Sequence, residues 1–181
     1  MSQTKRCFIA IDLPENICNE IKRLQEQLYI KNVFDASYTN SKQAHLTLVF
    51  LGNISQNQII EIKEKLEKIK FHQIKLSLDK LGYFDERKIK IMWIGLKQKE
   101  LIELHKKIKI TLRGIVKQDI EFIPHITIAR IKKYELKEMV KDTVLKTKVN
   151  KIQFDIDSFS LKESKLIESK YHYFEIERFK L

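Results

Sequence analysis

Two tetrapeptides in the sequence carry the residue types that acid–base chemistry needs. They are His45-Leu46-Thr47-Leu48 and His125-Ile126-Thr127-Ile128, and each places a histidine two residues before a threonine. Because side chains alternate along an extended strand, the histidine and the threonine of each tetrapeptide share one face, and the aliphatic residues occupy the other. An imidazole changes its protonation state near neutral pH. Two imidazoles that face one groove can therefore divide the roles of acid and base.

Each tetrapeptide alone has an ordinary structural explanation. In an amphipathic strand, threonine is favoured by its β-propensity, and histidine serves as a hydrogen-bonded polar neighbour. The chain contains five histidines, however, and two of them stand in the same order of histidine, aliphatic, threonine, aliphatic. A repeat of this kind is rarely an accident, so it favours a functional pair over two unrelated strands.

A positive charge follows the second tetrapeptide. Arg130 lies five residues after His125, and Thr47 and Thr127 contribute two hydroxyl groups, so the set could hold an anion. In a regular strand Arg130 would point away, because positions 125, 127 and 129 share one face. A bulge or the end of the strand must turn Arg130 toward the groove if it serves the site.

Other catalytic chemistries lack the residues they need. The sequence has no glycine-rich phosphate loop, no dinucleotide-binding fingerprint, no cysteine cluster and no carboxylate cluster, so we expect neither a metal ion nor a cofactor. Metal-free acid–base cleavage of a phosphodiester fits the two histidines better. The net charge of +11 favours a polyanionic partner, and the 2′-hydroxyl of RNA allows cyclic phosphates that DNA cannot form.

The elements that must position these residues follow from apolar periodicity. Alternation and apolar runs predict strands, and apolar residues at helical spacing predict helices, one of them opened by a capping box at Ser55 and Gln58. The polar segments 85–88 and 162–170 are expected to be a turn and a loop. The predicted strands are 6–12, 44–51, 74–84, 89–96, 125–131, 151–161 and 171–179, and the predicted helices are 14–29, 55–69, 101–115 and 135–146.

The order of these elements repeats along the chain. Each half has the order strand, helix, strand, helix, strand, and the second strand of each half carries one tetrapeptide. We therefore expect a single domain over residues 1–181 made of two pseudo-symmetric lobes. The predicted fold class is α+β, with two antiparallel-rich sheets that face a central groove and helices packed outside them.

We expect a cytoplasmic protein that acts as a monomer. No uncharged stretch is apolar enough to span a membrane, and the apolar run 7–11 is too short for a signal peptide. We expect no contact with a membrane. Cys7 and Cys18 fall in a predicted strand and a predicted helix, and both are expected to be free thiols because a core of this size needs no disulfide.

With these residues in place, the sequence resembles the two-histidine phosphoesterases. Within them it is most similar to the RNA 2′,3′-cyclic phosphodiesterases, also called 2′-5′ RNA ligases. The resemblance extends over essentially the whole chain, and the paired motif is its most specific part. The segments that carry it are 6–14, 44–52, 91–96 and 124–130, with 159–164, Tyr173 and 178–179 near the end.

The resemblance implies an activity and a role for each site residue. A terminal RNA 2′,3′-cyclic phosphate would be hydrolysed to a 2′-phosphate, and some relatives also join 2′-5′ ends in reverse. His45 would protonate the departing 3′-oxygen and His125 would activate water, while Thr47, Thr127 and Arg130 hold the phosphate. The implied partner is RNA with cyclic phosphate ends, tRNA fragments being one candidate source.

Two positions depart from the family's pattern. Val49 stands where a lysine is often found, and Asp85 follows Phe84 where many relatives have proline. Both departures bear on substrate contacts. Two other functions stay open at this point: a non-catalytic RNA-binding module, and a phosphodiesterase for another nucleotide, such as a 2′-5′ oligonucleotide or an ADP-ribose cyclic phosphate.

The other ring-bearing residues have weaker assignments. Phe8 is a candidate for stacking a base, with core packing as the favoured alternative. His72 and His105 lie on charged segments and are expected at the surface, and His172 is expected to have a structural role in the last strand. The same choice between stacking and core packing as for Phe8 applies to Tyr83, Phe84 and Trp93.

Overall fold

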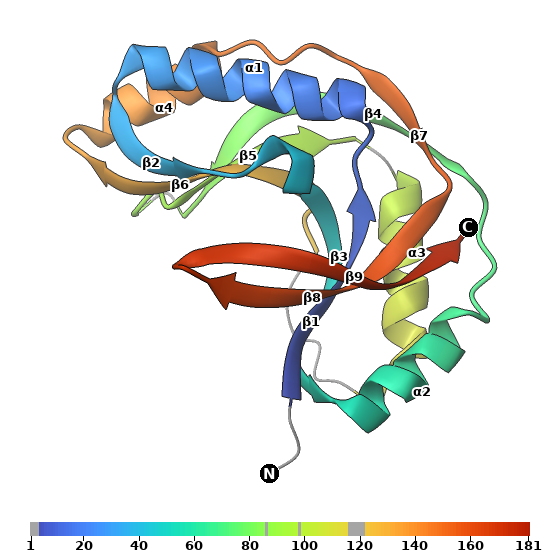
Figure 1. Ribbon diagram of the computed structural model, residues 1–181. Coiled ribbons are helices and arrows are strands. Elements are labelled where there is room, and N and C mark those ends of the chain that lie inside the picture. The colour runs from blue at the N-terminus through green and yellow to red at the C-terminus, as the bar shows by residue number, and fades with distance from the viewer. Residues whose placement is uncertain (1–3, 86, 98, 116–121) are drawn as a thin grey trace.

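The computed structural model describes residues 4–85, 87–97, 99–115 and 122–181, so Glu86 of the predicted turn lies outside the described residues. Helices and strands alternate irregularly along the chain (Figure 1). The helices are α1 (Glu15–Lys31), α2 (Gln56–Leu66), α3 (Lys99–Thr111) and α4 (Lys137–Lys146), with a short 3-10 helix η1 (Ser41–Gln43). The strands are β1 (Thr4–Asp12), β2 (Phe34–Tyr38), β3 (His45–Ser55), β4 (Ile74–Phe84), β5 (Ile91–Leu96), β6 (His125–Tyr134), β7 (Gln153–Ile156), β8 (Ser158–Ile167) and β9 (Lys170–Lys180).

The strands form one curled antiparallel sheet. Its order is β7-β4-β5-β6-β3-β1-β8-β9, and β2 lies off this path and pairs with the later part of β6. The two central strands are β3 and β6, which are joined through Leu46 and Ile126. These are the residues between histidine and threonine in the two tetrapeptides, so the two motifs lie side by side. The predicted α+β class is confirmed, and the two expected sheets are connected at this point.

The helices cover the outer surface of the curled sheet (Figure 1). Helices α2 and α3 pack against β3, α1 packs against β6, and α4 packs against β4. The predicted apolar stripe of α1 is fully buried, as are the stripes of α2 and α3. The inner, concave side of the sheet is left to the histidine and threonine side chains.

The two sides of the sheet do not coincide with the two halves of the sequence. On one side, β3 pairs with β1, β1 with β8 and β8 with β9, whereas on the other side β5 pairs with β6 and β4 with β7. Helix α1 follows β1 in the chain yet packs on β6. Strands from both halves of the chain therefore meet on each side of the sheet.

The predicted capping box opens α2. The Ser55 hydroxyl accepts a hydrogen bond from the Gln58 backbone at 3.3 Å, and the Gln58 side chain accepts one from the Ser55 backbone at 2.9 Å. This reciprocal pair satisfies two of the backbone N–H groups that a helix start leaves without partners. It also ends β3 at a defined residue, ten positions after His45.

The predicted loop at 162–170 is wrong. Strand β8 continues through Ile167 and pairs with β9 along its whole length, and the predicted strand 151–161 is divided into β7 and β8. A two-residue turn closes the hairpin, with positive φ of 47° at Glu168 and 63° at Ser169. Lys162 and Glu163 are buried, but each is paired with an opposite charge, on Asp12 and Lys5. Beyond them the hairpin is largely exposed and is held by backbone pairing rather than by apolar burial, so polar residues are accepted there.

Strand β2 and helix η1 were not predicted either. Residues 34–38 alternate between half-buried and exposed positions, and as an edge strand β2 pairs only with β6 in the described sheet. The short run carries too little apolar periodicity to distinguish a strand from a loop. Its position beside β6 nevertheless brings Thr39 to the motif, through a hydrogen bond from the Thr39 N–H to the Ile128 carbonyl.

Both cysteines are free thiols, as expected. Cys7 is buried in β1, and burial raises the pKa of its thiol to about 11. Cys18 is partly buried, and burial likewise raises the pKa of its thiol. The neutral thiol is therefore favoured at both positions. Within the described ranges, no helix has the length and apolarity required to cross a bilayer.

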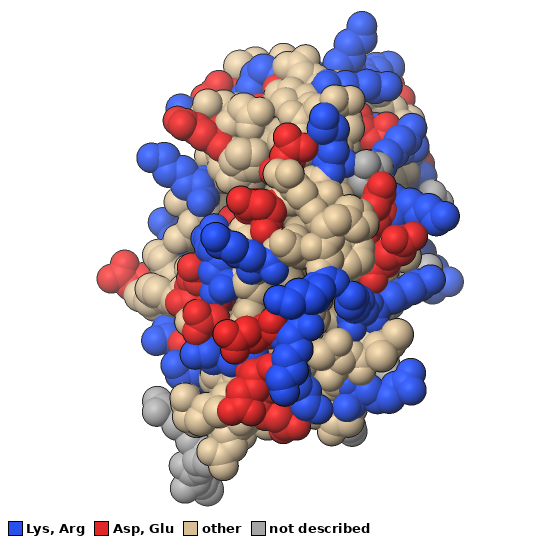
Figure 2. Space-filling view, turned by 90° about the vertical axis from the view of Figure 1, so that its right-hand side faces the viewer, with Lys and Arg blue, Asp and Glu red and all other residues tan. Residues whose placement is uncertain are grey.

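Positive charge does not dominate the face of the molecule that carries α2 and α3 (Figure 2). Figure 2 shows the side of the molecule that carries α2, α3 and the end of β9 in Figure 1. Basic and acidic side chains are interspersed over this face, with uncharged surface between them. The face seen in Figure 2 is thus a mixed, solvated surface and not a uniform basic patch.

Candidate active site

The two motif histidines open into one pocket of about 540 Å³ on the concave side of the sheet. Side chains of β1, β3, β6, β8 and β9 line the pocket. Because β3 and β6 meet between their motif residues, both histidines and both threonines face the same space. All six residues proposed from the sequence line this pocket: Phe8, His45, Thr47, His125, Thr127 and Arg130.

Each catalytic candidate has its ring held by the same local contact. The Nδ1 atom of His45 lies 2.9 Å from the Gln43 carbonyl oxygen, and that of His125 lies 2.7 Å from the Ile123 carbonyl oxygen. A carbonyl only accepts, so Nδ1 must carry the proton in both rings. The basic nitrogen of each neutral imidazole is therefore Nε2.

Aromatic rings pack against the imidazole of His45. The Phe8 ring centroid lies 4.9 Å and the Tyr173 ring centroid 4.7 Å from that of His45. Only 4% of Phe8 is exposed, which leaves little ring face for a base. Its position favours the core-packing alternative, with Phe8 supporting His45 from β1.

His125 has an equivalent aromatic support on the other side of the pocket. Phe84 meets the imidazole edge-on at 4.8 Å, and Trp93 lies 6.4 Å away between centroids. Trp93 in turn lies over Gly82, where an added Cβ would come within 2.2 Å of the indole. Glycine at position 82 thus makes room for the ring that backs His125. Tyr83 is half-buried against the core.

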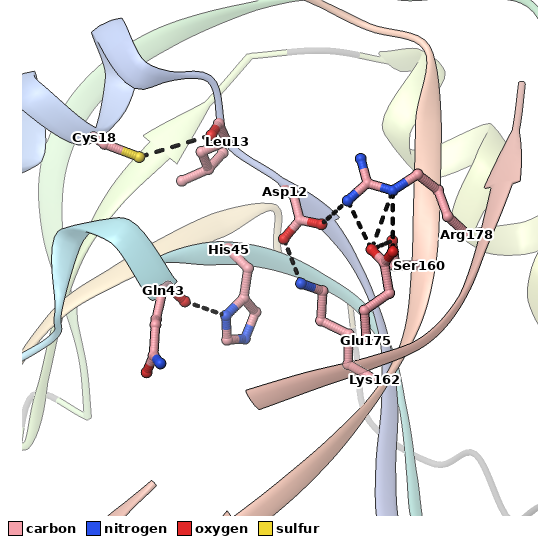
Figure 3. A network of polar contacts seen from close by, with 9 residues as sticks. All are labelled: Asp12, Leu13, Cys18, Gln43, His45, Ser160, Lys162, Glu175 and Arg178. Atoms are coloured by element: carbon pink, nitrogen blue, oxygen red, sulfur yellow. Dashed lines mark hydrogen bonds and ion pairs between the residues drawn. The ribbon is translucent and has the colours of Figure 1, made fainter. Parts of the chain in front are cut away.

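An ion-pair network borders His45 (Figure 3). The Lys162 ammonium contacts the Asp12 carboxylate at 2.5 Å, and Arg178 bridges Asp12 at 3.1 Å and Glu175 at 2.7 Å. Asp12 is the cross-strand partner of His45 in the pairing of β1 with β3. Lys162 is nearly buried, so its charge is compensated by Asp12 and not by water.

Both histidines are easier to deprotonate than a free imidazole. Burial lowers the pKa of His45, the hydrogen bond to Gln43 opposes that shift, and Lys162 lowers the pKa further while Asp12 raises it. Burial also lowers the pKa of His125, and the positive charge of Arg130 adds to this effect. In the free protein both pKa values therefore lie below the ordinary value of about 6.5.

Both motif strands bulge three residues after the histidine. In the pairing of β1 with β3, Ile9 faces Val49 and Ala10 faces Thr47, so Leu48 is the extra residue. In the pairing of β5 with β6 the register skips Ile128 in the same way. An extra residue reverses the alternation of side chains beyond it. The fifth residue after each histidine consequently turns into the pocket.

The bulge in β6 therefore provides the turn that Arg130 requires. Ala129 is fully buried behind the sheet, and the exposed Arg130 lines the pocket with His125 and Thr127. Within the described part of the chain, no carboxylate forms an ion pair with Arg130. Its guanidinium is thus available for an anion.

Phe50 is one of the pocket residues that the sequence reasoning missed. It occupies in β3 the position that Arg130 occupies in β6, five residues after the histidine, and it lines the pocket with 52% of its surface exposed. The matching offset from the two histidines was the signal that could have revealed it. A large exposed ring at a pocket rim provides a surface for another planar group.

A helix side chain satisfies the carbonyl at each bulge. His105 of α3 donates from Nδ1 to the Leu48 carbonyl at 2.8 Å, and Gln25 of α1 donates from Nε2 to the Ile128 carbonyl at 2.8 Å. These donors help to satisfy carbonyls that a bulge displaces from the strand ladder, and the Ile128 carbonyl also accepts from the Thr39 N–H. The prediction of His105 at the surface is wrong: the ring is half-buried and stacks on Phe122, with 4.3 Å between centroids.

The other two histidines lie away from the pocket. His72 is exposed beside Phe71, as expected. His172 pairs with Lys165 across the β8–β9 hairpin, which agrees with a structural role in the last strand. Within the ranges that the structure describes, no group of three or more His, Cys, Asp or Glu is placed to hold a metal ion.

Comparison with known sequences now places the chain. The profile of the 2′-5′ RNA ligase superfamily matches residues 13–165. The chain belongs to this superfamily. A protein of Methanocaldococcus jannaschii named RNA 2′,3′-cyclic phosphodiesterase is 33% identical over 166 residues, which is 91% of both chains. A protein of Archaeoglobus fulgidus with the same name is 27% identical over 163 residues, covering 88% of this chain and 90% of its own.

Solved structures agree with this assignment at the level of the fold. Apo LigT of E. coli superposes with a TM-score of 0.80 at 22% identity and covers 99% of this chain and 98% of its own. The protein TT0787 of Thermus thermophilus gives a TM-score of 0.80 at 21% identity, with 97% of both chains covered. The resemblance stated from the sequence is thus confirmed, and this superfamily member is an enzyme of the cyclic phosphodiesterase family.

Proposed function

We propose that this superfamily member hydrolyses the 2′,3′-cyclic phosphodiester at the 3′ end of RNA and leaves a 2′-phosphomonoester. The observation that carries the proposal is the pair of imidazoles in one pocket, each with Nδ1 bound to a carbonyl and Nε2 left for proton transfer. The names of the relatives from Methanocaldococcus jannaschii and Archaeoglobus fulgidus support the same reaction.

The proposed reaction needs one proton acceptor and one proton donor. Nε2 of His125 takes a proton from water while the water oxygen attacks phosphorus, and the bond from phosphorus to the 3′-oxygen breaks. The 3′-oxygen receives the proton of Nε2 from His45. The product carries a 2′-phosphate and a 3′-hydroxyl, and the imidazoles exchange protons with solvent before the next turnover.

The surroundings of the two histidines support this division of roles. Arg130 disfavours the charged form of His125, which suits a base that must be neutral. Asp12 favours the charged form of His45, which suits an acid, although burial and Lys162 oppose it. A bound phosphate anion would add a further negative charge and raise the pKa of His45 within the complex.

The phosphate would be held from both motif strands. Thr47 and Thr127 lie one pleat beyond the histidines on the same face, and Arg130 offers a planar pair of donors that matches two phosphate oxygens. A structure of E. coli LigT complexed with phosphate, 23% identical to this chain, has the same fold with a TM-score of 0.74. That fold therefore accommodates the anion we assign to this pocket.

The base of the terminal nucleotide would stack on Phe50. This ring is exposed and lines the pocket. Because β3 and β6 are antiparallel and pair at Leu46 and Ile126, Phe50 and Arg130 extend toward opposite sides of that pairing. Stacking on an aromatic face tolerates any base, so we expect weak sequence preference. The proposed substrate is an RNA end, with tRNA fragments as one source, and we propose that a monomer acts on it without a cofactor.

A 2′-5′ joining reaction, the reverse of cleavage at a 2′-5′ linkage, is part of the proposal. A 5′-hydroxyl would take the place of water: Nε2 of His125 takes its proton while its oxygen attacks phosphorus, the bond from phosphorus to the 3′-oxygen breaks, and His45 protonates that oxygen, so that a 2′-5′ phosphodiester forms. A non-catalytic RNA-binding module is the weaker alternative, because a grip on phosphate alone needs permanent charges and not two imidazoles locked in one tautomer.

The test is turnover of an RNA oligonucleotide that ends in a 2′,3′-cyclic phosphate, with identification of the phosphate position in the product. We expect a 2′-phosphate, a kcat lowered by about 10²–10⁴ in His125→Ala, and unchanged turnover in excess EDTA. A 3′-phosphate product, or loss of activity in EDTA that a divalent ion restores, would contradict the mechanism. His72→Ala, which removes an exposed histidine, is the matched control.

A further inference from the structure

The pocket extends beyond the groups that the proposed reaction uses. Its outer end is lined by Arg6 of β1 and by Ser164 and Tyr171 of the β8–β9 hairpin. In Figure 1 this hairpin crosses β1 and projects past it on the concave side of the sheet. A nucleoside cyclic phosphate held between the histidines and Phe50 would leave this outer end unfilled.

Arg6 brings an uncompensated positive charge to the outer end of the pocket. Its neighbour Lys5 is paired with Glu163 at 3.1 Å, and Lys162 is paired with Asp12. Among the residues that the structure describes, Arg6 has no such carboxylate partner. Its guanidinium lies 6.0 Å from the centroid of the Tyr171 ring, so the two form a cation–aromatic pair.

The spacing along β1 relates Arg6 to the reacting phosphate. Arg6 and Phe8 lie on the same face of the strand, and the Phe8 ring contacts His45. Two residues of extended strand span about 6.6 Å, which is comparable with the step from one backbone phosphate to the next in a nucleic acid strand. Arg6 is therefore about one nucleotide step along β1 from Phe8, whose ring contacts the candidate acid.

The tyrosines of β9 continue the same direction. Tyr173 packs edge-on against His45 and Phe8, whereas Tyr171, on the same face two residues nearer the hairpin turn, keeps 47% of its surface exposed. Burial raises the pKa of Tyr173, and the charges of both Arg130 and Arg6 oppose that rise. Tyr173 thus shares the pocket with two guanidiniums whose charges both act on it, those of Arg130 and Arg6.

We propose that Arg6 and Tyr171 form a second nucleotide subsite, which binds the phosphodiester and the base of the nucleotide that precedes the cyclic phosphate. This inference rests on the proposed function. Arg6 would contact the bridging phosphate, and the exposed Tyr171 ring would stack the penultimate base. The enzyme then acts on the ends of RNA chains in preference to free nucleoside cyclic phosphates.

The test compares two substrates that share a terminal base: a nucleoside 2′,3′-cyclic phosphate and a dinucleotide ending in that group. We expect wild-type enzyme to have a kcat/KM about tenfold higher for the dinucleotide, and Arg6→Ala or Tyr171→Ala to remove this advantage. Both variants should keep kcat/KM for the mononucleotide within about twofold, because neither residue touches the terminal nucleotide.

Lys170→Ala is the matched control. It removes a charge from an exposed position next to Tyr171, on the other face of the hairpin, and should leave the ratio of the two kcat/KM values unchanged. An equal effect of Lys170→Ala and Arg6→Ala would show general attraction by charge and would overturn the subsite. An equal kcat/KM of wild-type enzyme for both substrates would overturn it as well.

A binding measurement separates the subsite from catalysis. Calorimetry with the corresponding 2′-phosphate products should give a Kd about tenfold lower for the dinucleotide than for the mononucleotide, and Arg6→Ala should abolish that difference. If neither cyclic phosphate is hydrolysed but the difference in Kd is present, the proposed function fails and the subsite stands. Hydrolysis of both with no difference in Kd or kcat/KM overturns the subsite alone.

Discussion

Strands β3 and β6 use one backbone device to present two different side chains. Each has a histidine whose Nδ1 binds a carbonyl two residues upstream, a bulge three residues later, and a fifth residue turned into the pocket. That fifth residue is Phe50 in β3 and Arg130 in β6. The difference divides the pocket into a side suited to a planar base and a side suited to a phosphate.

The surroundings of the two histidines differ in the same sense. His45 lies beside the ion pair of Asp12 and Lys162, and both charges shift its pKa. For His125, Arg130 is the one charged residue of the described segments that shifts the pKa. A carboxylate near one imidazole and a guanidinium near the other favour opposite protonation states. The repeated strands are thus equivalent in backbone but not in charge, and this difference can be tested by unequal mutational effects.

The largest expected effect is on proton transfer. His45→Ala and His125→Ala should each lower kcat by about 10²–10⁴, and the double variant should lose far less than the product of the two factors. A cyclic phosphate with sulfur in place of the 3′-oxygen separates the roles, because a thiolate leaves without a proton. We expect it to restore turnover in His45→Ala but not in His125→Ala; the reverse pattern would exchange the assignments.

Arg130→Ala and Phe50→Ala should show that the two sides bind different groups. A lost hydrogen bond to a charged group costs about 1.5–3 kcal/mol, so Arg130→Ala should lower kcat/KM by about 10- to 150-fold whatever the base. Phe50→Ala should act through KM by about tenfold and should have no effect on a ribose 2′,3′-cyclic phosphate without a base. Phe174→Ala, at an exposed ring outside the pocket, is the control. Equal losses on the abasic substrate would contradict the division.

A smaller effect is expected where the helices hold the bulges. Gln25→Leu should lower kcat/KM about threefold to tenfold by displacing Arg130, because it leaves the Ile128 carbonyl with one donor fewer. If it acts through Arg130, it should cause no further loss in an Arg130→Ala background, whereas a general loss of stability would persist there.

The equivalent residue on the other strand provides the comparison. His105→Leu should raise KM through Phe50 and should add to Arg130→Ala, while His105→Gln, which keeps an N–H donor for the Leu48 carbonyl, should restore most of the activity. Kinetic constants of the single and double variants, with melting temperatures measured alongside, check both helices. Additivity of Gln25→Leu with Arg130→Ala would assign Gln25 to stability alone.

The smallest effects concern pH. Because burial lowers the pKa of both histidines, a plot of kcat/KM against pH should be bell-shaped, with its maximum below about pH 6.5. In the complex the bound phosphate raises the pKa of His45, so the alkaline limb of the kcat profile should lie at higher pH than that of kcat/KM. Because the pKa values of the two histidines are lower in the folded state than in the unfolded state, the unfolded chain takes up protons at higher pH than the folded protein. The contribution of the two histidines to the free energy of unfolding should be fully present above about pH 6.5 and should decrease as the pH falls toward their folded-state pKa values.

Two measurements check these expectations. A profile of kcat/KM against pH with a maximum above neutrality would contradict the lowered pKa values. Thermal unfolding between about pH 5 and 8, with and without a 2′-phosphate nucleotide, should show the loss of stability on acidification and its partial recovery with the ligand. His45→Asn should reduce the slope, since it removes one group that protonates preferentially in the unfolded chain.

Local patterns are sufficient for a large part of this protein. The period of two places His45 with Thr47 and His125 with Thr127, and the Ser55 capping box marks the start of α2. The helix stripes are also correct in position. Each of these features depends on residues close together in the chain, so the sequence alone contains the information that determines them.

Tertiary structure alone decided which side chains join the motifs. The run Leu48-Val49 and the run Ile128-Ala129 are compatible with a regular strand, and it is the register against β1 and β5 that makes a bulge and turns Phe50 and Arg130 into the pocket. The side chains that donate to the bulge carbonyls come from helices that lie far away in the sequence. Side-chain alternation is a property of one strand, whereas register and the capture of displaced carbonyls require a second strand and a packed helix, which no local pattern contains.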